Sequence, residues 1–204
     1  MTLVFLHGSG CSKEVWTHQV SFFKNSLALN LPGHPDGQAL DNVPALAQWL
    51  REQLATMDLS DVVLVGHSLG SAIAIQAALL REARIKALVL IGSGARLKVM
   101  PQLLESLNKL DEEGSEIPDY LLAANQTISE PLRTKVNTSI KEHGARVMLK
   151  DFSACNHFDV MDDLYKISLP VQLIVGDMDQ MTPVKYSLYL KEKLKNARLN
   201  IVEG

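Results

Sequence analysis

The sequence predicts an α/β fold: a doubly wound, mostly parallel sheet with a helical lid inserted between two strands. Short apolar runs alternate with helical patterns over most of the chain, and one stretch, 96–168, contains helical patterns alone. With 204 residues, 47% of them hydrophobic and 21% charged, the chain fits one globular domain carrying an insertion. We therefore expect residues 1–95 and 169–204 to form the sheet with its helices, and residues 96–168 to form the lid.

Six runs are continuously apolar rather than alternating, which is typical of strands buried on both faces. Such strands belong to parallel sheets whose faces are covered by helices. The predicted strands are Thr2–Leu6, Leu27–Leu31, Val62–Val65, Ala87–Ile91, Val171–Val175 and Leu199–Val202. We expect the first run to be a strand and not part of a signal peptide, because it has neither a basic start nor a long apolar stretch.

Two helices are predicted between these strands. In Leu40–Met57 the apolar side chains recur on one helical face, with Asp41 as the expected N-cap and Pro44 in the first turn. Leu69–Leu80 is rich in Ala, Ile and Leu, so we expect it to be largely buried. Strands that alternate with such helices favour a sheet wound on both faces.

The predicted lid contains two further amphipathic patterns. One is a stripe of apolar side chains over 100–110, and the other begins after Pro131 and ends at Gly144. A polar run at 111–116 separates them and predicts an exposed connection. A helical insertion between two sheet strands is expected to lie over the carboxyl edge of the sheet, where ligands bind in such folds.

Residues 66–70 spell Gly-His-Ser-Leu-Gly and match the pattern G-x-S-x-G. The pattern follows an apolar strand and begins a helix, which is the setting that the chemistry requires. A sharp turn there holds Ser68 above the sheet edge as a nucleophile. The backbone N–H of Leu69 lies at a helix N-terminus, where donors lack partners and the dipole favours negative charge, so we expect it to stabilise an oxyanion.

A second oxyanion donor is predicted directly after the first strand. Residues 7–10 spell His-Gly-Ser-Gly, and their glycines permit the close backbone approach that an anion site needs. We assign the backbone N–H of Ser9 as this donor. His7 is interpreted as a structural residue that holds the loop.

Four strings together carry a resemblance to a known family. They are HGSG (7–10), NLPGH (30–34), GHSLG (66–70) and LIVGDMDQMTP (173–183). In order and spacing the chain resembles the α/β-hydrolase superfamily over its whole length, and most of all its esterase-like and carbon–carbon-bond hydrolase branches. The resemblance implies a triad in the order serine, acid, histidine. The acid follows the next-to-last strand, which implies Asp179, with Asp177 as the competitor.

The third triad member is where the sequence departs from the family. The histidine is expected in a loop after the last strand, and the sequence reaches Gly204 at the place where that loop should begin. We therefore expect the catalytic histidine beyond Gly204. Of the other histidines, His18, His34, His67 and His143 are interpreted as surface or structural residues, and the side chain of His67 is expected to point away from the serine. His157, in the predicted lid, is the fallback base.

Composition excludes several other classes of protein. The formal net charge is −3 and no Lys/Arg block stands out, so we expect neither a nucleic acid nor a membrane as partner. Cys11 and Cys155 have no metal-site spacing and are expected to be free thiols in a reducing cytoplasm, with no metal and no cofactor. The oligomeric state cannot be inferred from the sequence.

These observations predict a serine hydrolase that cleaves a small or medium ester, thioester or lactone through an acyl-serine intermediate. Three alternatives remain open. The resemblance also implies carbon–carbon-bond hydrolysis of a small-molecule substrate. A receptor of the same fold would use the same pocket to sense a small molecule with little turnover. A chain without its histidine would be kept for binding alone.

Overall fold

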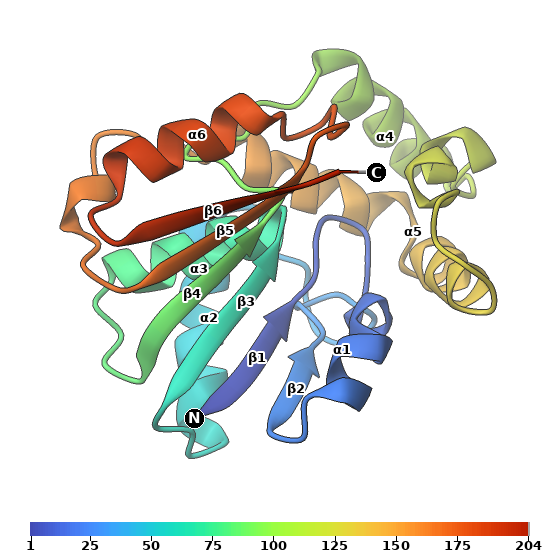
Figure 1. The fold of residues 1–204 in the computed structure, drawn as a ribbon. Helices are drawn as coiled ribbons and strands as arrows, with labels where there is room; N and C mark the ends of the chain where they lie inside the picture. The colour runs from blue at the N-terminus through green and yellow to red at the C-terminus, as the bar shows by residue number, and fades with distance from the viewer. Residues whose placement is uncertain (204) are drawn as a thin grey trace.

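The computed structural model describes residues 1–203, apart from the side chain of Ala124, and contains one six-stranded sheet (Figure 1). The strand order is β2-β1-β3-β4-β5-β6, and every neighbouring pair is parallel. The strands are β1 (Thr2–Leu6), β2 (Ser26–Leu29), β3 (Val62–His67), β4 (Ile85–Ile91), β5 (Val171–Gly176) and β6 (Ala197–Val202). The predicted parallel α/β fold and its six strands are confirmed.

Residues 1–203 also contain six α-helices and three short 3₁₀ turns, at Lys13–Trp16, Asp119–Asn125 and Leu164–Lys166. The helices are α1 (Thr17–Phe22), α2 (Val43–Thr56), α3 (Leu69–Leu79), α4 (Pro101–Glu113), α5 (Leu132–His157) and α6 (Val184–Lys193). Side chains of α2, α3 and α6 share one large apolar core with the sheet, and α1 lies beside β1 and β2 on the other side (Figure 1).

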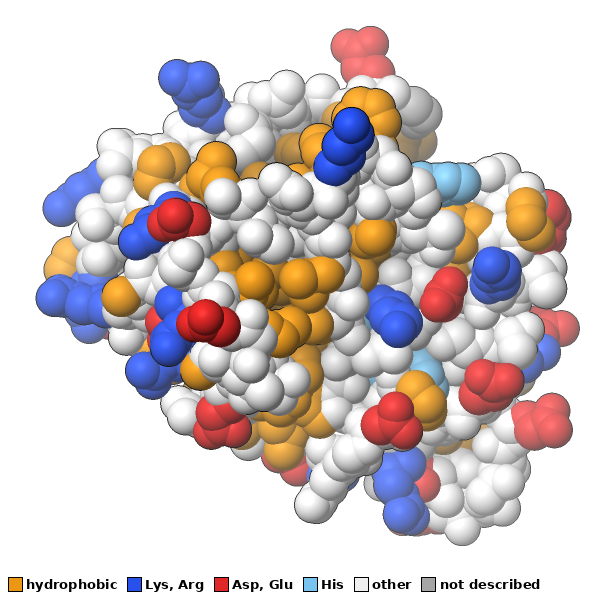
Figure 2. All heavy atoms as spheres, turned by 90° about the horizontal axis from the view of Figure 1, so that it is seen from below, with side chains coloured by type: hydrophobic (Ala, Val, Ile, Leu, Met, Phe, Trp, Pro, Cys, Tyr) orange, Lys and Arg blue, Asp and Glu red, His pale blue; other side chains and the backbone are white. Residues whose placement is uncertain are grey.

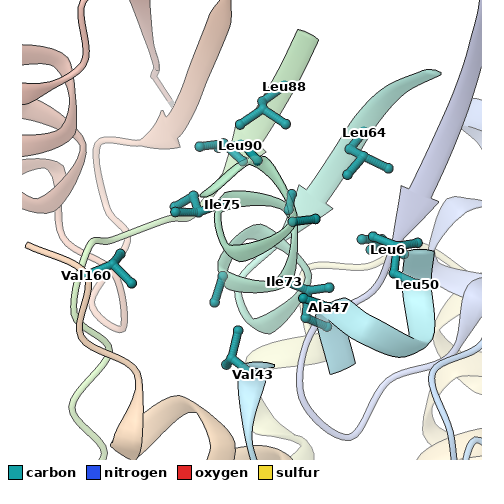
Figure 3. Packing of buried hydrophobic residues seen from close by; sticks show 14 of the residues in the cluster. Leu6, Val43, Ala47, Leu50, Leu64, Ile73, Ile75, Leu88, Leu90 and Val160 are labelled. Atoms are coloured by element: carbon teal, nitrogen blue, oxygen red, sulfur yellow. The ribbon is translucent and has the colours of Figure 1, made fainter. Parts of the chain in front are cut away.

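The main core lies between the sheet and α3. Nine residues of α3 are buried, which confirms the predicted buried helix. Figure 3 shows Ile73 and Ile75 of this helix among the leucines of the central strands, with Ala47 of α2 on its other side. Because α3 begins at the end of β3, this packing fixes the start of the helix against the carboxyl edge of the sheet.

The predicted helix between β2 and β3 is confirmed as α2, but its N-cap is Asn42 and not Asp41. The Ala45 N–H donates to Asn42 Oδ1 at 2.8 Å. Asp41 lies one residue too early to reach that amide, because an N-cap side chain accepts from the second or third helical residue. Its carboxylate instead accepts from Lys150 Nζ at 3.0 Å, which links the start of α2 to α5.

The second face of the sheet carries a smaller apolar cluster. Phe5, Val63 and Val65 are buried against Trp16, whose ring centroid lies 4.9 Å from that of Phe5. Ala87, Val89 and Ile91 extend this cluster along β4, although they are less completely covered. Figure 2 shows hydrophobic side chains gathered in a band across the side seen from below Figure 1, with charged side chains around it.

Residues 96–168 comprise two structural parts separated at Gly144, whose φ of 75° and ψ of 177° interrupt α5. Before it, α4 and the first half of α5 form a separate apolar cluster in which Leu107, Val136 and Ile140 are buried, and Ala145 and Met148, just after the break, belong to it as well. After it, the helix continues to His157, and Ala154 and Cys155 belong to the main core. Gly144 therefore ends the predicted helix as expected, while the helical turns that follow it were not predicted.

Among residues 1–203, no helix is both long and apolar enough to cross a lipid bilayer.

Candidate active site

Ser68 occupies a turn between β3 and α3 in which the backbone has almost no free space. Its φ is 52°, in the left-handed region that a side chain disfavours. A Cβ atom on Gly66 would lie 2.3 Å from the carbonyl oxygen of Gly70, and one on Gly70 would lie 2.3 Å from the carbonyl oxygen of Leu6. Both flanking residues must therefore be glycine for the chain to double back over β1.

Hydrogen bonds tie this turn to β4. The Ser68 N–H donates to the Ile91 carbonyl at 3.0 Å. The buried Ser71 hydroxyl lies 2.7 Å from the Gly66 carbonyl and 3.1 Å from that of Ile91, so it bridges the two strands. This role of Ser71 was not predicted, because a serine inside an apolar helical sequence gives no sign of its hydrogen-bond partners. Backbone hydrogen bonds and the Ser71 side chain therefore hold the turn in place.

The loop after β1 lies against the turn. A Cβ atom on Gly8 would lie 3.2 Å from Ser68 Cβ, so the loop and the serine are in close contact. The N–H groups of Ser9 and Leu69 donate to no acceptor among the described hydrogen bonds, and Leu69 is the first residue of α3. An oxyanion hole needs two such backbone donors near the attacking hydroxyl, and both N–H groups come from segments that contact Ser68.

Asp179 follows β5 and points towards the same edge. Its carboxylate accepts from the Thr182 hydroxyl at 2.7 Å and from the N–H groups of Thr182 and Met181 at 2.8 and 3.0 Å. A Cβ atom on Gly92, at the end of β4, would lie 3.3 Å from Asp179 Oδ2. Asp177 is exposed, and its N–H donates to the Val202 carbonyl. The half-buried Asp179 is therefore the carboxylate directed inward.

His67 lies between Asp179 and the loop after β1, a placement that sequence reasoning did not anticipate. A Cβ atom on Gly8 would lie 2.9 Å from its Nδ1, and one on Gly92 would lie 3.6 Å from its Cδ2. Desolvation by the atoms packed around the ring lowers the pKa of His67, and the nearby Asp179 carboxylate opposes this shift. Another part of the residue remains exposed to solvent. None of the described hydrogen bonds joins it to Ser68.

His7 is a structural residue, as predicted. It is fully buried; its Nε2 accepts the Leu31 N–H at 3.0 Å and its Nδ1 donates to the Gly8 carbonyl at 2.9 Å. Burial holds the pKa of His7 well below its usual range, and neighbouring His34 lowers it further. The neutral ring joins the loop after β1 to the loop after β2.

His157, the fallback base, lies at the exposed end of α5. Its Nδ1 donates to the Ser153 carbonyl at 2.8 Å, and the residue borders a surface hollow together with Asp41 and Arg146. Among the described hydrogen bonds, none joins a histidine to Ser68 or Asp179. The histidine expected beyond Gly204 lies outside the described residues.

Other reactive groups offer no rival chemistry at this edge. Burial raises the pKa of both the Cys11 and the Cys155 thiol to about 12, with Asp151 adding to the shift, so neither is a thiolate nucleophile near neutral pH. The described part of the chain contains no group of three or more His, Cys, Asp or Glu side chains that could hold a metal ion.

Comparison with known proteins gives consistent matches. Residues 3–199 match the model described as "Alpha/beta hydrolase family". The chain is 25% identical over 216 residues to a pimeloyl-[acyl-carrier protein] methyl ester esterase of Pseudoalteromonas atlantica, covering 97% of this chain and 84% of that protein. It is also similar to the solved structure of a lipase-esterase related protein from Clostridium acetobutylicum, with a TM-score of 0.85, 27% identity and coverage of 100% and 85% of the two chains. A solved thermophilic esterase is 29% identical, with a TM-score of 0.79 and coverage of 100% and 81%.

The close backbone contacts of the turn predict that Gly66→Ala destabilises the protein. The added methyl group would meet the backbone of Gly70, which cannot move aside as a side chain would, and overpacking of this kind costs about 1–3 kcal/mol or more. Urea unfolding measures the decrease in the free energy of unfolding. Gly176→Ala is the matched control, because nothing lies within 4 Å of its added carbon, and it should unfold within about 0.5 kcal/mol of the parent chain. Equal stability of the two variants would contradict the close contacts described here.

Proposed function

Because the chain belongs to the alpha/beta hydrolase family, we propose that it hydrolyses a small or medium ester, thioester or lactone through an acyl-serine intermediate. The observation that carries the proposal is the strained turn at Ser68, which begins α3 in close contact with the loop after β1. The N–H groups of Ser9 and Leu69 in these two segments donate to no acceptor among the described hydrogen bonds. The esterase names of the relatives support a carboxylic ester as substrate. The proposal requires no cofactor.

In the proposed reaction, Ser68 Oγ attacks the carbonyl carbon and its proton passes to a histidine. The carbonyl oxygen becomes an oxyanion held by the N–H groups of Ser9 and Leu69. Collapse of this intermediate expels the alcohol or thiol, which takes the proton, and leaves an acyl-serine. A water molecule then repeats the steps and releases the acid. Asp179 orients the imidazole, a role for which its inward carboxylate is suited.

The proposed base is a histidine that enters from the carboxyl end of β6, beyond Gly204, with His157 as the fallback. The Val202 carbonyl accepts the Asp177 N–H at 3.0 Å, so β6 reaches this edge two residues from Asp179. A short loop from that point is well placed to carry an imidazole between Asp179 and Ser68. His157, bonded to its own helix, would have to turn away from Ser153.

Ser68→Ala should abolish labelling by a fluorophosphonate probe without unfolding the chain. The variant removes the only oxygen that the probe can modify at this turn, and a change from serine to alanine adds no volume. Intact-protein mass spectrometry measures the label, and circular dichroism measures the fold. Ser21→Ala, at an exposed position on α1, is the control and should label like the parent. Undiminished labelling of Ser68→Ala would refute the proposed nucleophile.

Asp179→Asn should reduce ester hydrolysis by about 10³–10⁴-fold in a protein that has its base, because the imidazole loses its orienting charge. Asp177→Asn should stay within a few-fold of the parent, since its carboxylate is exposed and accepts no described hydrogen bond. Steady-state kinetics on p-nitrophenyl acetate compares the two variants. The reverse ranking would assign the acid to Asp177.

Residues 1–204 alone should hydrolyse p-nitrophenyl acetate only slightly faster than buffer, because a serine without a base is a weak nucleophile. The two N–H donors leave each protein molecule a residual acceleration of about 10³–10⁴-fold over water, which adds little to the observed rate when the protein is dilute. Free imidazole added to the assay should raise the rate in a manner that depends on Ser68. His157→Ala should change neither rate. High activity without imidazole that is lost in His157→Ala would make His157 the base.

A further inference from the structure

One face of α5 contacts the loop that carries the proposed oxyanion donor. Met148, Asp151 and Cys155 are spaced three and four residues apart and therefore lie on the same side of the helix. Cys155 Sγ lies 3.5 Å from Ser9 Oγ, and Asp151 Oδ2 accepts the Gly10 N–H at 2.7 Å. A Cβ atom on Gly10 would lie 2.8 Å from Met148 Cγ, so the helix also packs directly on the loop. These three residues on one face of α5 thus contact two adjacent residues of the loop, Ser9 and Gly10.

The carboxylate of Asp151 is almost fully buried, with 1% of the residue exposed. A buried carboxylate needs partners, because water no longer solvates it. Its partners are the Gly10 N–H and the His34 ring, whose Nε2 lies 3.0 Å from Oδ2. No Lys or Arg pairs with it among the described ion pairs. The interaction therefore joins α5 to the loops after β1 and β2 at a single atom.

The surroundings of His34 assign the proton in this interaction. His34 is fully buried, and its Nδ1 lies 3.2 Å from the carbonyl oxygens of both Leu31 and Pro32. Carbonyl oxygens only accept, so Nδ1 carries a hydrogen. Nε2 faces a carboxylate oxygen, so a second proton must lie between Nε2 and Oδ2. The ring and the carboxyl group are thus joined by a buried hydrogen bond that holds both in place.

This arrangement determines which N–H of the loop is free. The Gly10 N–H is taken by Asp151, and the Cys11 N–H donates to the Gly8 carbonyl at 3.2 Å. Between them, the Ser9 N–H donates to no acceptor among the described hydrogen bonds. The Gly10 N–H lies in the peptide plane between Ser9 and Gly10, so Asp151 fixes the residue that follows the donor, and Gly10 has a φ of 69°. The Ser9 N–H lies in the preceding peptide plane, whose Gly8 carbonyl accepts the Cys11 N–H.

We propose that Asp151 is a positioning residue of the oxyanion hole: by binding Gly10 N–H and His34 together, it orients the Ser9 N–H towards Ser68. The proposal rests on the proposed function, in which Ser9 N–H and Leu69 N–H hold the oxyanion. It gives α5 a direct part in the site, because a carboxylate from residues 96–168 sets the geometry of a loop from the sheet.

The test compares Asp151→Ala and Asp151→Asn with Glu82→Gln. Glu82 is the matched control, since it is also a buried carboxylate and accepts a backbone N–H, that of Arg84. It pairs with Arg51 of α2. The first readout is the rate of Ser68 labelling by a fluorophosphonate, whose phosphoryl oxygen occupies the oxyanion hole. The second is amide hydrogen exchange at Gly10, which needs no activity.

We expect Asp151→Ala to slow labelling by roughly 10–100-fold, approaching the loss seen when an oxyanion donor is removed. The Gly10 amide should exchange faster in the same variant. Asp151→Asn keeps an oxygen for Gly10 and should recover most of the labelling rate, which a purely charge-dependent role would not allow. Glu82→Gln should lower the melting temperature and leave both site readouts unchanged.

Unchanged labelling in a folded Asp151→Ala protein would overturn the proposal, and faster Gly10 exchange with unchanged labelling would reduce Asp151 to a structural contact. An equal loss of labelling in Glu82→Gln would assign the effect to general destabilisation and would also overturn it. If the parent chain is not labelled at Ser68 even with imidazole added as a base, the proposed function fails. In that case Gly10 exchange alone decides whether Asp151 holds the loop, and unchanged exchange would overturn the proposal as well.

Discussion

The contact between two stretches of backbone, at the start of α3 and the end of β1, is the constraint on which the site depends. Gly70 approaches the Leu6 carbonyl so closely that even one added carbon would lie 2.3 Å from it. The strand register continues this contact, since Leu6 pairs with Gly66 across the two parallel strands. The loop after β1 must therefore emerge beside Ser68. The main chain brings this loop to the serine, and in our proposal Asp151 then orients the Ser9 N–H within it.

A cluster of polar side chains, His7, His34, His143, Asp151 and Cys155, packs against the loops after β1 and β2. Burial lowers the pKa of His7 and of His143 and raises that of the Cys155 thiol, so it favours the neutral form of each. The His34–Asp151 pair shares a proton, because Nδ1 of His34 faces two carbonyl oxygens and its Nε2 faces Oδ2 of Asp151. A hydrogen bond in this low-dielectric setting is stronger than the same bond in water. This explains how α5 can hold a loop to which it is not connected in sequence.

The sequence predicted the parts of the molecule that depend on local pattern. Continuous apolar runs identified all six strands, and the flanking glycines of residues 66–70 identified the turn at Ser68. The N-cap of α2 was wrong by one residue, because Asp41 and Asn42 are both good caps and only the position of Ala45 decides between them. The second half of α5 was not predicted, since Gly144 ends one helical pattern. The buried Asp151 also interrupts the apolar pattern of the residues that follow, so they resemble an exposed polar segment. Asp151 and His34 are 117 residues apart, and no local pattern reports such a pair.

The non-helical residue Gly144 divides residues 96–168 into two parts that pack differently. Its φ of 75° suits glycine, and nothing lies within 4 Å of the position that a Cβ would occupy, so the break reflects backbone conformation and not crowding. On one side, α4 and the first half of α5 pack around Leu107 and contribute nothing to the main core. On the other side, the second half of α5 is buried against the sheet and holds Gly10 through Asp151. Ala145 and Met148, just after the break, still belong to the cluster of α4 and the first half of α5, so the second half of α5 contacts both the outer helices and the loop that contains Gly10. The polar contact to the loop therefore comes from the half of the helix that is packed on the sheet.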